Sequence, residues 1–106
     1  MFNEQRQTQR KVLKVKALIA LDGGASLTVR TVDISSSGMC VSTAEPVTLG
    51  ANCQVRFDLL VDGKPSAIQV RSRVSYCILS GNEFKVGLQF VNLDLASMTA
   101  LARFLR

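Results

Sequence analysis

Two arginines and a short polar motif are the residues of this sequence best suited to binding a ligand. Arg6 and Arg10 lie four residues apart near the N-terminus, and Asp33, Ser35 and Gly38 follow between two apolar runs. Arginine forks match phosphate oxygens and the acceptor edge of guanine. A carboxylate can accept from guanine N–H groups, a serine hydroxyl can donate to phosphate, and glycine lets a ligand approach the backbone. Together they fit a small pocket for a guanine nucleotide with phosphates.

Each half of this pattern also has an ordinary structural interpretation. Asp, Ser and Gly are common turn formers, so the motif alone is consistent with a turn between two strands. Two arginines in a basic segment are often solvated surface charges. The combination of both halves in this order favours ligand binding, and the turn geometry can serve both purposes. Ser36 and Ser37, at the variable positions of the motif, are weaker candidates for contacts.

The positive charge of the chain is concentrated at its N-terminus. Residues 1–16 contain five basic side chains against one carboxylate, whereas the other residues contain eight basic and seven acidic ones. Such a segment attracts an anionic partner. Because it has few apolar groups, we expect residues 1–11 to be mobile when empty and to be ordered by a phosphate-rich ligand.

The composition argues against catalysis and against a metal site. The chain has no histidine, which removes the usual general base and the commonest metal ligand. Its three cysteines, Cys40, Cys53 and Cys77, are far apart in sequence and show neither a disulfide framework nor a metal spacing. No apolar run is long enough to span a bilayer, and no signal peptide is evident, so we expect a cytoplasmic protein without membrane insertion.

Most of the chain alternates between apolar and polar residues, which is typical of half-buried strands. Six such runs, joined by short turns, predict an antiparallel sandwich or barrel. One face of the fifth run contains Val74, Tyr76 and Ile78, so the pattern places Tyr76 on an apolar face. The runs cover residues 13–21, 27–31, 39–43, 53–59, 68–78 and 84–90.

The last segment changes to a helical period. Leu95, Met98, Leu101 and Leu105 recur at three- and four-residue intervals beside Phe104, which predicts a short amphipathic helix that packs across one opening of the barrel. Asp94 precedes it as a suitable N-cap.

The two motifs, Arg-x-x-x-Arg followed by Asp-x-Ser-x-x-Gly, resemble those of the PilZ family in a chain of similar size. The segment Lys85-Val86-Gly87-Leu88-Gln89-Phe90, followed by a leucine-rich helix, is similar to the end of such domains. The resemblance covers essentially the whole chain. It implies a six-stranded antiparallel Greek-key-like β-barrel over residues 12–106 with a closing helix at about 94–106, preceded by a basic arm over residues 1–11.

The resemblance also implies a function, because PilZ domains are bacterial receptors for the second messenger cyclic di-GMP. By this likeness the ligand-binding residues are Arg6, Arg10, Asp33, Ser35 and Gly38. Tyr76 is a further candidate, since several PilZ domains place a guanine-stacking aromatic near this point, although a core tyrosine is an equal interpretation. Some members have an additional arginine at the position of Gln5, and that arginine helps to hold a second nucleotide. Since this chain has glutamine there, the number of bound nucleotides stays open. No cofactor is implied, and the output is expected to be a separate, unidentified effector protein.

Other classes of function remain as alternatives. Small basic β-barrels often bind single-stranded nucleic acid through a basic groove and exposed aromatic side chains. Here Phe57, Phe84 and Phe90 fall on the core faces of their strands, so no nucleic-acid partner is expected. A ligand-independent adaptor is the other alternative, and the complete motif residues argue against it.

Overall fold

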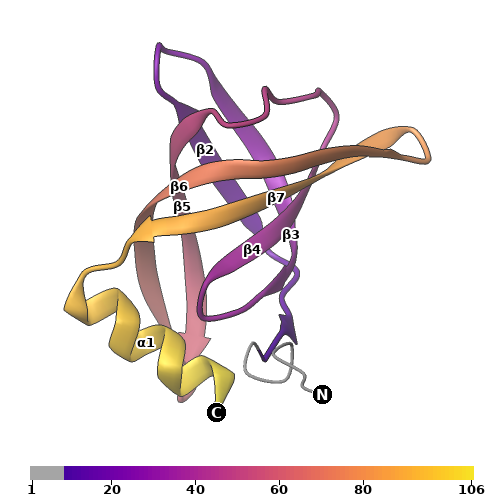
Figure 1. Ribbon diagram of the computed structural model, residues 1–106. Coiled ribbons are helices and arrows are strands. Elements are labelled where there is room, and N and C mark those ends of the chain that lie inside the picture. The colour runs from indigo at the N-terminus through magenta and orange to yellow at the C-terminus, as the bar shows by residue number, and fades with distance from the viewer. Residues whose placement is uncertain (1–8) are drawn as a thin grey trace, which may run out of the picture.

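The computed structural model describes residues 9–106, which form antiparallel strands followed by one C-terminal helix (Figure 1). Six strands close into a barrel in the order β3-β2-β5-β6-β7-β4, and β4 pairs back onto β3. A short additional strand, β1, also pairs with β3. This confirms the predicted six-stranded antiparallel barrel with a C-terminal helix. The elements are β1 (Lys11–Val12), β2 (Lys16–Leu21), β3 (Ser26–Ile34), β4 (Gly38–Thr43), β5 (Asn52–Val61), β6 (Lys64–Ser80), β7 (Glu83–Asn92) and α1 (Leu95–Leu105).

Most connections are tight hairpins between neighbouring strands, and the link from β4 to β5 joins two strands that do not pair with each other. The β5–β6 turn shows how the sequence specifies such a hairpin. Asp62 and Gly63 both have positive φ, at 52° and 78°, which is the conformation favoured by the twist of a two-residue hairpin. Asp62 and Gly63 therefore form one of the short turns that the alternating runs predicted.

The core follows directly from the alternation in the sequence. In β5, Val55, Phe57 and Leu59 point into the barrel and are buried, whereas Arg56 and Asp58 point outward. In β7, Val86 and Leu88 are buried as well, so the predicted runs 53–59 and 84–90 both contribute their apolar faces to the core. Cys53 is fully buried in the same row and behaves as a small apolar residue, with its thiol pKa raised by burial.

One buried hydroxyl, together with backbone hydrogen bonds to β3, holds the chain between β1 and β2. Thr31 in β3 donates to the carbonyl of Leu13 at 2.5 Å and accepts from the N–H of Val15 at 2.8 Å, so it fills the break between the two strands. This arrangement keeps β1 beside the end of β3, where Lys11 pairs with Ile34. Lys11, which we had assigned to the arm, therefore already belongs to a strand. Residues 1–8, which make up most of the predicted arm, lie outside the described residues.

The closing helix begins and ends close to its predicted limits. The Asp94 carboxylate accepts from the N–H of Ser97 at 2.7 Å as an N-cap, and this backbone hydrogen bond lowers the pKa of Asp94. The helix packs against β5 and β6 with Leu101 buried. The prediction that Leu95 and Met98 lie on the buried face was wrong: they are 77% and 47% exposed, because α1 meets the barrel through the face of Ser97 and Leu101. No helix within residues 9–106 is long and apolar enough to cross a membrane.

Candidate functional site

The motif, residues 33–38, covers the end of β3, the turn at residues 35–37 and the first residue of β4. Ser35 is fully buried within it, and its hydroxyl accepts from the backbone N–H groups of Ser37 and Gly38, each at 3.2 Å. The same hydroxyl donates to the carbonyl of Gly38 at 3.2 Å. These hydrogen bonds all stay inside the turn, so in this structure Ser35 shapes the loop around the site.

Gly38 is required by the approach of β4 to β7. A side-chain Cβ at this position would overlap the backbone carbonyl of Leu88, the residue of β7 that lies one position from its partner Gln89. The neighbouring atom belongs to the backbone and has little freedom to move. The motif glycine therefore has a packing role that does not depend on any ligand.

An ion pair joins the two motifs, although they are far apart in sequence. The Arg10 guanidinium donates to the Asp33 carboxylate with an Nη2–Oδ1 distance of 2.8 Å. The hydrogen bond to Asp33 raises the pKa of Arg10 above its ordinary value. Both side chains keep contact with solvent, at 48% and 29% exposure, so this pair is accessible to a ligand. Asp33 faces outward because β3 has a bulge at Val32 that shifts its register against β4. Arg6 lies outside the described residues.

Tyr76 leaves the core face of β6 because of a second bulge. Val74 pairs with Leu88 and Tyr76 with Gly87, so Ser75 is an extra residue in β6. Val74 is buried, whereas Tyr76 is 37% exposed. The placement of Tyr76 and Ile78 on the same apolar face as Val74 was therefore wrong. The Tyr76 ring instead covers Gly87, where any Cβ would overlap it.

The surroundings of the Tyr76 hydroxyl favour the neutral phenol. Its interaction with the Cys40 side chain, together with burial, raises the pKa of Tyr76 to about 12. The positive charge of Arg10 acts in the opposite direction and lowers it.

Titration of Tyr76 can be followed directly, because the chain has one tyrosine and no tryptophan. We expect the phenolate absorbance of the empty protein to rise with a midpoint near pH 12, against about 10 for an unperturbed tyrosine. Since the folded pKa is raised, the associated stability is intact below the unfolded pKa and is lost as the pH rises towards the folded one. A midpoint at the unperturbed value, with circular dichroism showing a folded barrel, would contradict this environment.

Beside the ion pair lies a small cleft of about 230 Å³, and Asp33 is not among the residues that line it. Arg10 and Ser37 line it from the motif side, and Tyr76 lies on the opposite strands. Sequence reasoning missed Ser75 and Gln89 and undervalued Ser37, since only the pairing of β4, β6 and β7 brings them to this place. The full lining is Arg10, Ser35, Ser37, Gly38, Met39, Ser75, Tyr76, Gly87, Leu88 and Gln89.

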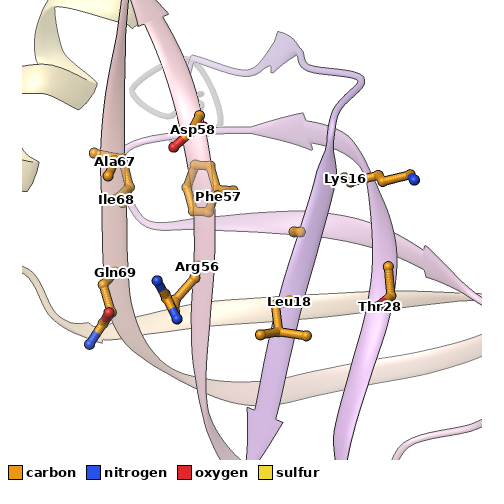
Figure 2. A pocket seen from close by; sticks show the side chains of 10 residues that line it. Lys16, Leu18, Thr28, Arg56, Phe57, Asp58, Ala67, Ile68 and Gln69 are labelled. Atoms are coloured by element: carbon orange, nitrogen blue, oxygen red, sulfur yellow. The ribbon is translucent and has the colours of Figure 1, made fainter.

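A larger hollow of about 580 Å³ lies elsewhere, where β2 and β5 stop pairing beyond Leu18 and Arg56 (Figure 2). Figure 2 shows its side chains on β2, β3, β5 and β6. None of the motif residues lines this hollow, so its size alone does not make it the better candidate site. Within residues 9–106 no cluster of three His, Cys, Asp or Glu side chains is placed to hold a metal ion.

Comparison with known protein families decides the classification of the chain. The family model described as PilZ domain matches residues 4–106. The chain belongs to the PilZ domain family. A search of curated proteins found no match.

Solved structures of several proteins share the fold at low sequence identity. The Bacillus subtilis inhibitor of motility, MotI/DgrA, gives a TM-score of 0.80 at 16% identity, over 93% of this chain and 48% of that chain. The Borreliella burgdorferi PlzA protein, solved in complex with c-di-GMP, gives 0.66 at 14% identity, over 100% and 41%. The PilZ domain of Escherichia coli YcgR, solved with c-di-GMP, gives 0.72 at 15% identity, over 96% and 89%. This PilZ chain thus spans less than half the length of the B. subtilis and B. burgdorferi proteins.

Proposed function

We propose that this PilZ domain is a non-catalytic cytoplasmic receptor that binds cyclic di-GMP and passes the signal to a separate partner protein. The observation that carries the proposal is the Arg10–Asp33 ion pair beside a small cleft that also holds Tyr76. Two proteins of similar fold, PlzA and YcgR, have been solved with c-di-GMP.

The roles of the residues follow from their chemistry and position. Arg10, with Arg6, supplies guanidinium forks for phosphate and for the acceptor edge of guanine. Asp33 accepts from guanine N–H groups once Arg10 turns to the ligand. Ser35 and Gly38 maintain the turn, as their buried hydrogen bonds and close packing support. Tyr76 offers a half-exposed ring on which a base can stack.

Arg10 can exchange Asp33 for a ligand phosphate at a small cost in free energy. A half-exposed ion pair such as Arg10–Asp33 is worth only about 0–1 kcal/mol. A ligand phosphate, which carries a full charge and several acceptor oxygens, can therefore replace Asp33 as the partner of Arg10. In the empty protein, Asp33 keeps the guanidinium at the cleft, so less conformational entropy is lost when the ligand binds.

Isothermal titration with cyclic di-GMP tests the proposal. We expect saturable binding to the wild-type protein, and much weaker binding of GTP and of the linear dinucleotide, because these present phosphates without the cyclic arrangement of two guanines. A single-stranded oligonucleotide in the same series tests the nucleic-acid alternative. That alternative is already disfavoured because Phe57 is buried and Phe84 and Phe90 are partly buried against the core. Absence of heat at high micromolar cyclic di-GMP would end the receptor proposal.

A further inference from the structure

Lys11 connects the strand beside the cleft to the end of the C-terminal helix. Its ammonium group donates to the main-chain carbonyl of Phe104 at 2.8 Å. The same Nζ lies 4.9 Å from the centre of the Phe104 ring. Lys11 is also held by its backbone, since β1 pairs Lys11 with Ile34. Two segments 93 residues apart are joined at this point.

The Lys11–Phe104 contact lies at the end of α1 that a cation stabilises. The last carbonyl groups of a helix have no intrahelical donors, and a cation near the C-terminal end is favoured by the helix dipole. Phe104 lies in the last turn of α1, which ends at Leu105. Lys11 therefore acts as an external cap for this turn and adds a cation–π contact to its ring.

Arg10 and Lys11 are neighbours in the chain, and their side chains point to opposite sides of the segment. Successive side chains of an extended strand point to opposite faces. Arg10 points to Asp33 and the cleft, whereas Lys11 points to α1. Whatever fixes Arg10 also fixes the backbone from which Lys11 reaches the helix.

Within residues 9–106, α1 has one other side-chain hydrogen bond to the barrel. Arg103 donates to the Asp62 carboxylate in the β5–β6 turn at 3.1 Å. Neither residue lines the cleft, and both are exposed. The Lys11 contact is thus the polar link that runs from the cleft side of the barrel to the helix.

We propose that Lys11 couples occupancy of the cleft to the stability of the last turn of α1. Ligand held by Arg10 stabilises β1 on β3, and β1 then holds Lys11 against Phe104. Coupling between two sites is reciprocal. Loss of the Lys11–Phe104 contact therefore weakens ligand binding by the same factor by which the ligand stabilises that contact. The proposal rests on the proposed function and makes α1 an element whose stability responds to the ligand.

Hydrogen exchange on Lys11→Met, with and without cyclic di-GMP, tests this coupling. In the wild-type protein the ligand is expected to slow exchange of the amides in the last turn of α1. Lys11→Met should abolish that effect and weaken cyclic di-GMP binding about fivefold, at the low end of measured couplings because the contact is exposed. Lys11→Arg, which restores a cation and a donor, should recover most of both effects.

Two control variants separate coupling from a general loss of charge or of helix contacts. Lys14→Met removes an exposed lysine from the same segment, and Asp62→Asn weakens the other contact of α1. Both should leave the affinity and the ligand-induced protection of α1 unchanged. Equal protection of α1 by ligand in Lys11→Met and wild type would overturn the proposal.

The empty protein supplies a readout that does not depend on ligand. Without cyclic di-GMP, Lys11→Met should speed exchange in the last turn of α1, while the Lys14→Met control should not. If the wild type binds no cyclic di-GMP but this difference is seen, the receptor proposal fails while the link between β1 and α1 stands. If exchange in the empty Lys11→Met variant equals that of the wild type, the link itself is absent.

Discussion

Replacement of Arg10 with alanine is expected to weaken cyclic di-GMP binding by roughly ten- to hundredfold, with little change in the stability of the barrel. Hydrogen bonds to charged groups are worth about 1.5–3 kcal/mol each, which corresponds to this range of affinity. The fold is spared because Arg10 lies outside the core and its ion pair with Asp33 is half-exposed. Isothermal titration and urea denaturation of the same protein sample measure the two quantities.

Matched variants identify what is lost in Arg10→Ala. Arg6→Ala is expected to behave similarly in binding, as the other half of the arginine motif. Arg56→Ala removes an exposed arginine that lines the larger hollow between β2 and β5. Unchanged binding in this variant would show that the ligand does not bind in that hollow. Wild-type affinity in Arg10→Ala, or a stronger loss in Arg56→Ala, would contradict the assignment of the cleft. Asp33→Ala is expected to reduce binding and also to lose its contact beside the β3–β4 turn.

Replacement of Gly38 with alanine is expected to destabilise the fold by about 3 kcal/mol, since overpacking of this kind costs about 1–3 kcal/mol and sometimes more. The new Cβ would overlap the carbonyl of Leu88, and this backbone oxygen cannot move without disturbing the pairing of β4 with β7. The midpoint of urea denaturation should fall accordingly. Loss of ligand binding in this variant would follow from loss of the turn.

Gly87→Ala and Ser36→Ala provide the comparison for Gly38→Ala. At Gly87 the added Cβ would meet the Tyr76 ring, which is a side chain and can turn away, so a smaller loss of stability is expected. Ser36 is exposed in the same turn as Gly38 and should tolerate alanine within about 0.5 kcal/mol. Equal stability of Gly38→Ala and Ser36→Ala would show that the approach of β4 to β7 is not as close as described.

The pattern of the sequence was enough to predict the elements and most of the core. Alternation over 53–59 placed Val55, Phe57 and Leu59 inside the barrel, and these side chains are buried. Asp94 was predicted as the N-cap of a terminal helix because a carboxylate can accept from the free N–H groups of the first turn. Such features depend on a few neighbouring residues, so the local sequence contains the information that determines them.

The face of α1 that packs on the barrel was decided by tertiary structure. Leu95 and Met98 fit the helical stripe by spacing, yet they remain exposed, while the smaller Ser97 is buried. The spacing defines where apolar residues lie on the helix. The direction from which the barrel approaches depends on where β7 ends and where β5 and β6 offer a surface.

The site shows the same division most clearly. The sequence by itself determined which residue types are available: two arginines, an acidic turn motif and one tyrosine. Tertiary structure decided that Arg10 reaches Asp33, that Ser35 makes its hydrogen bonds inside the turn, and that Tyr76 faces the cleft instead of the core. The physical reason is that a bulge such as the one at Ser75 is set by pairing with a partner strand, and one inserted residue reverses the face of every side chain that follows.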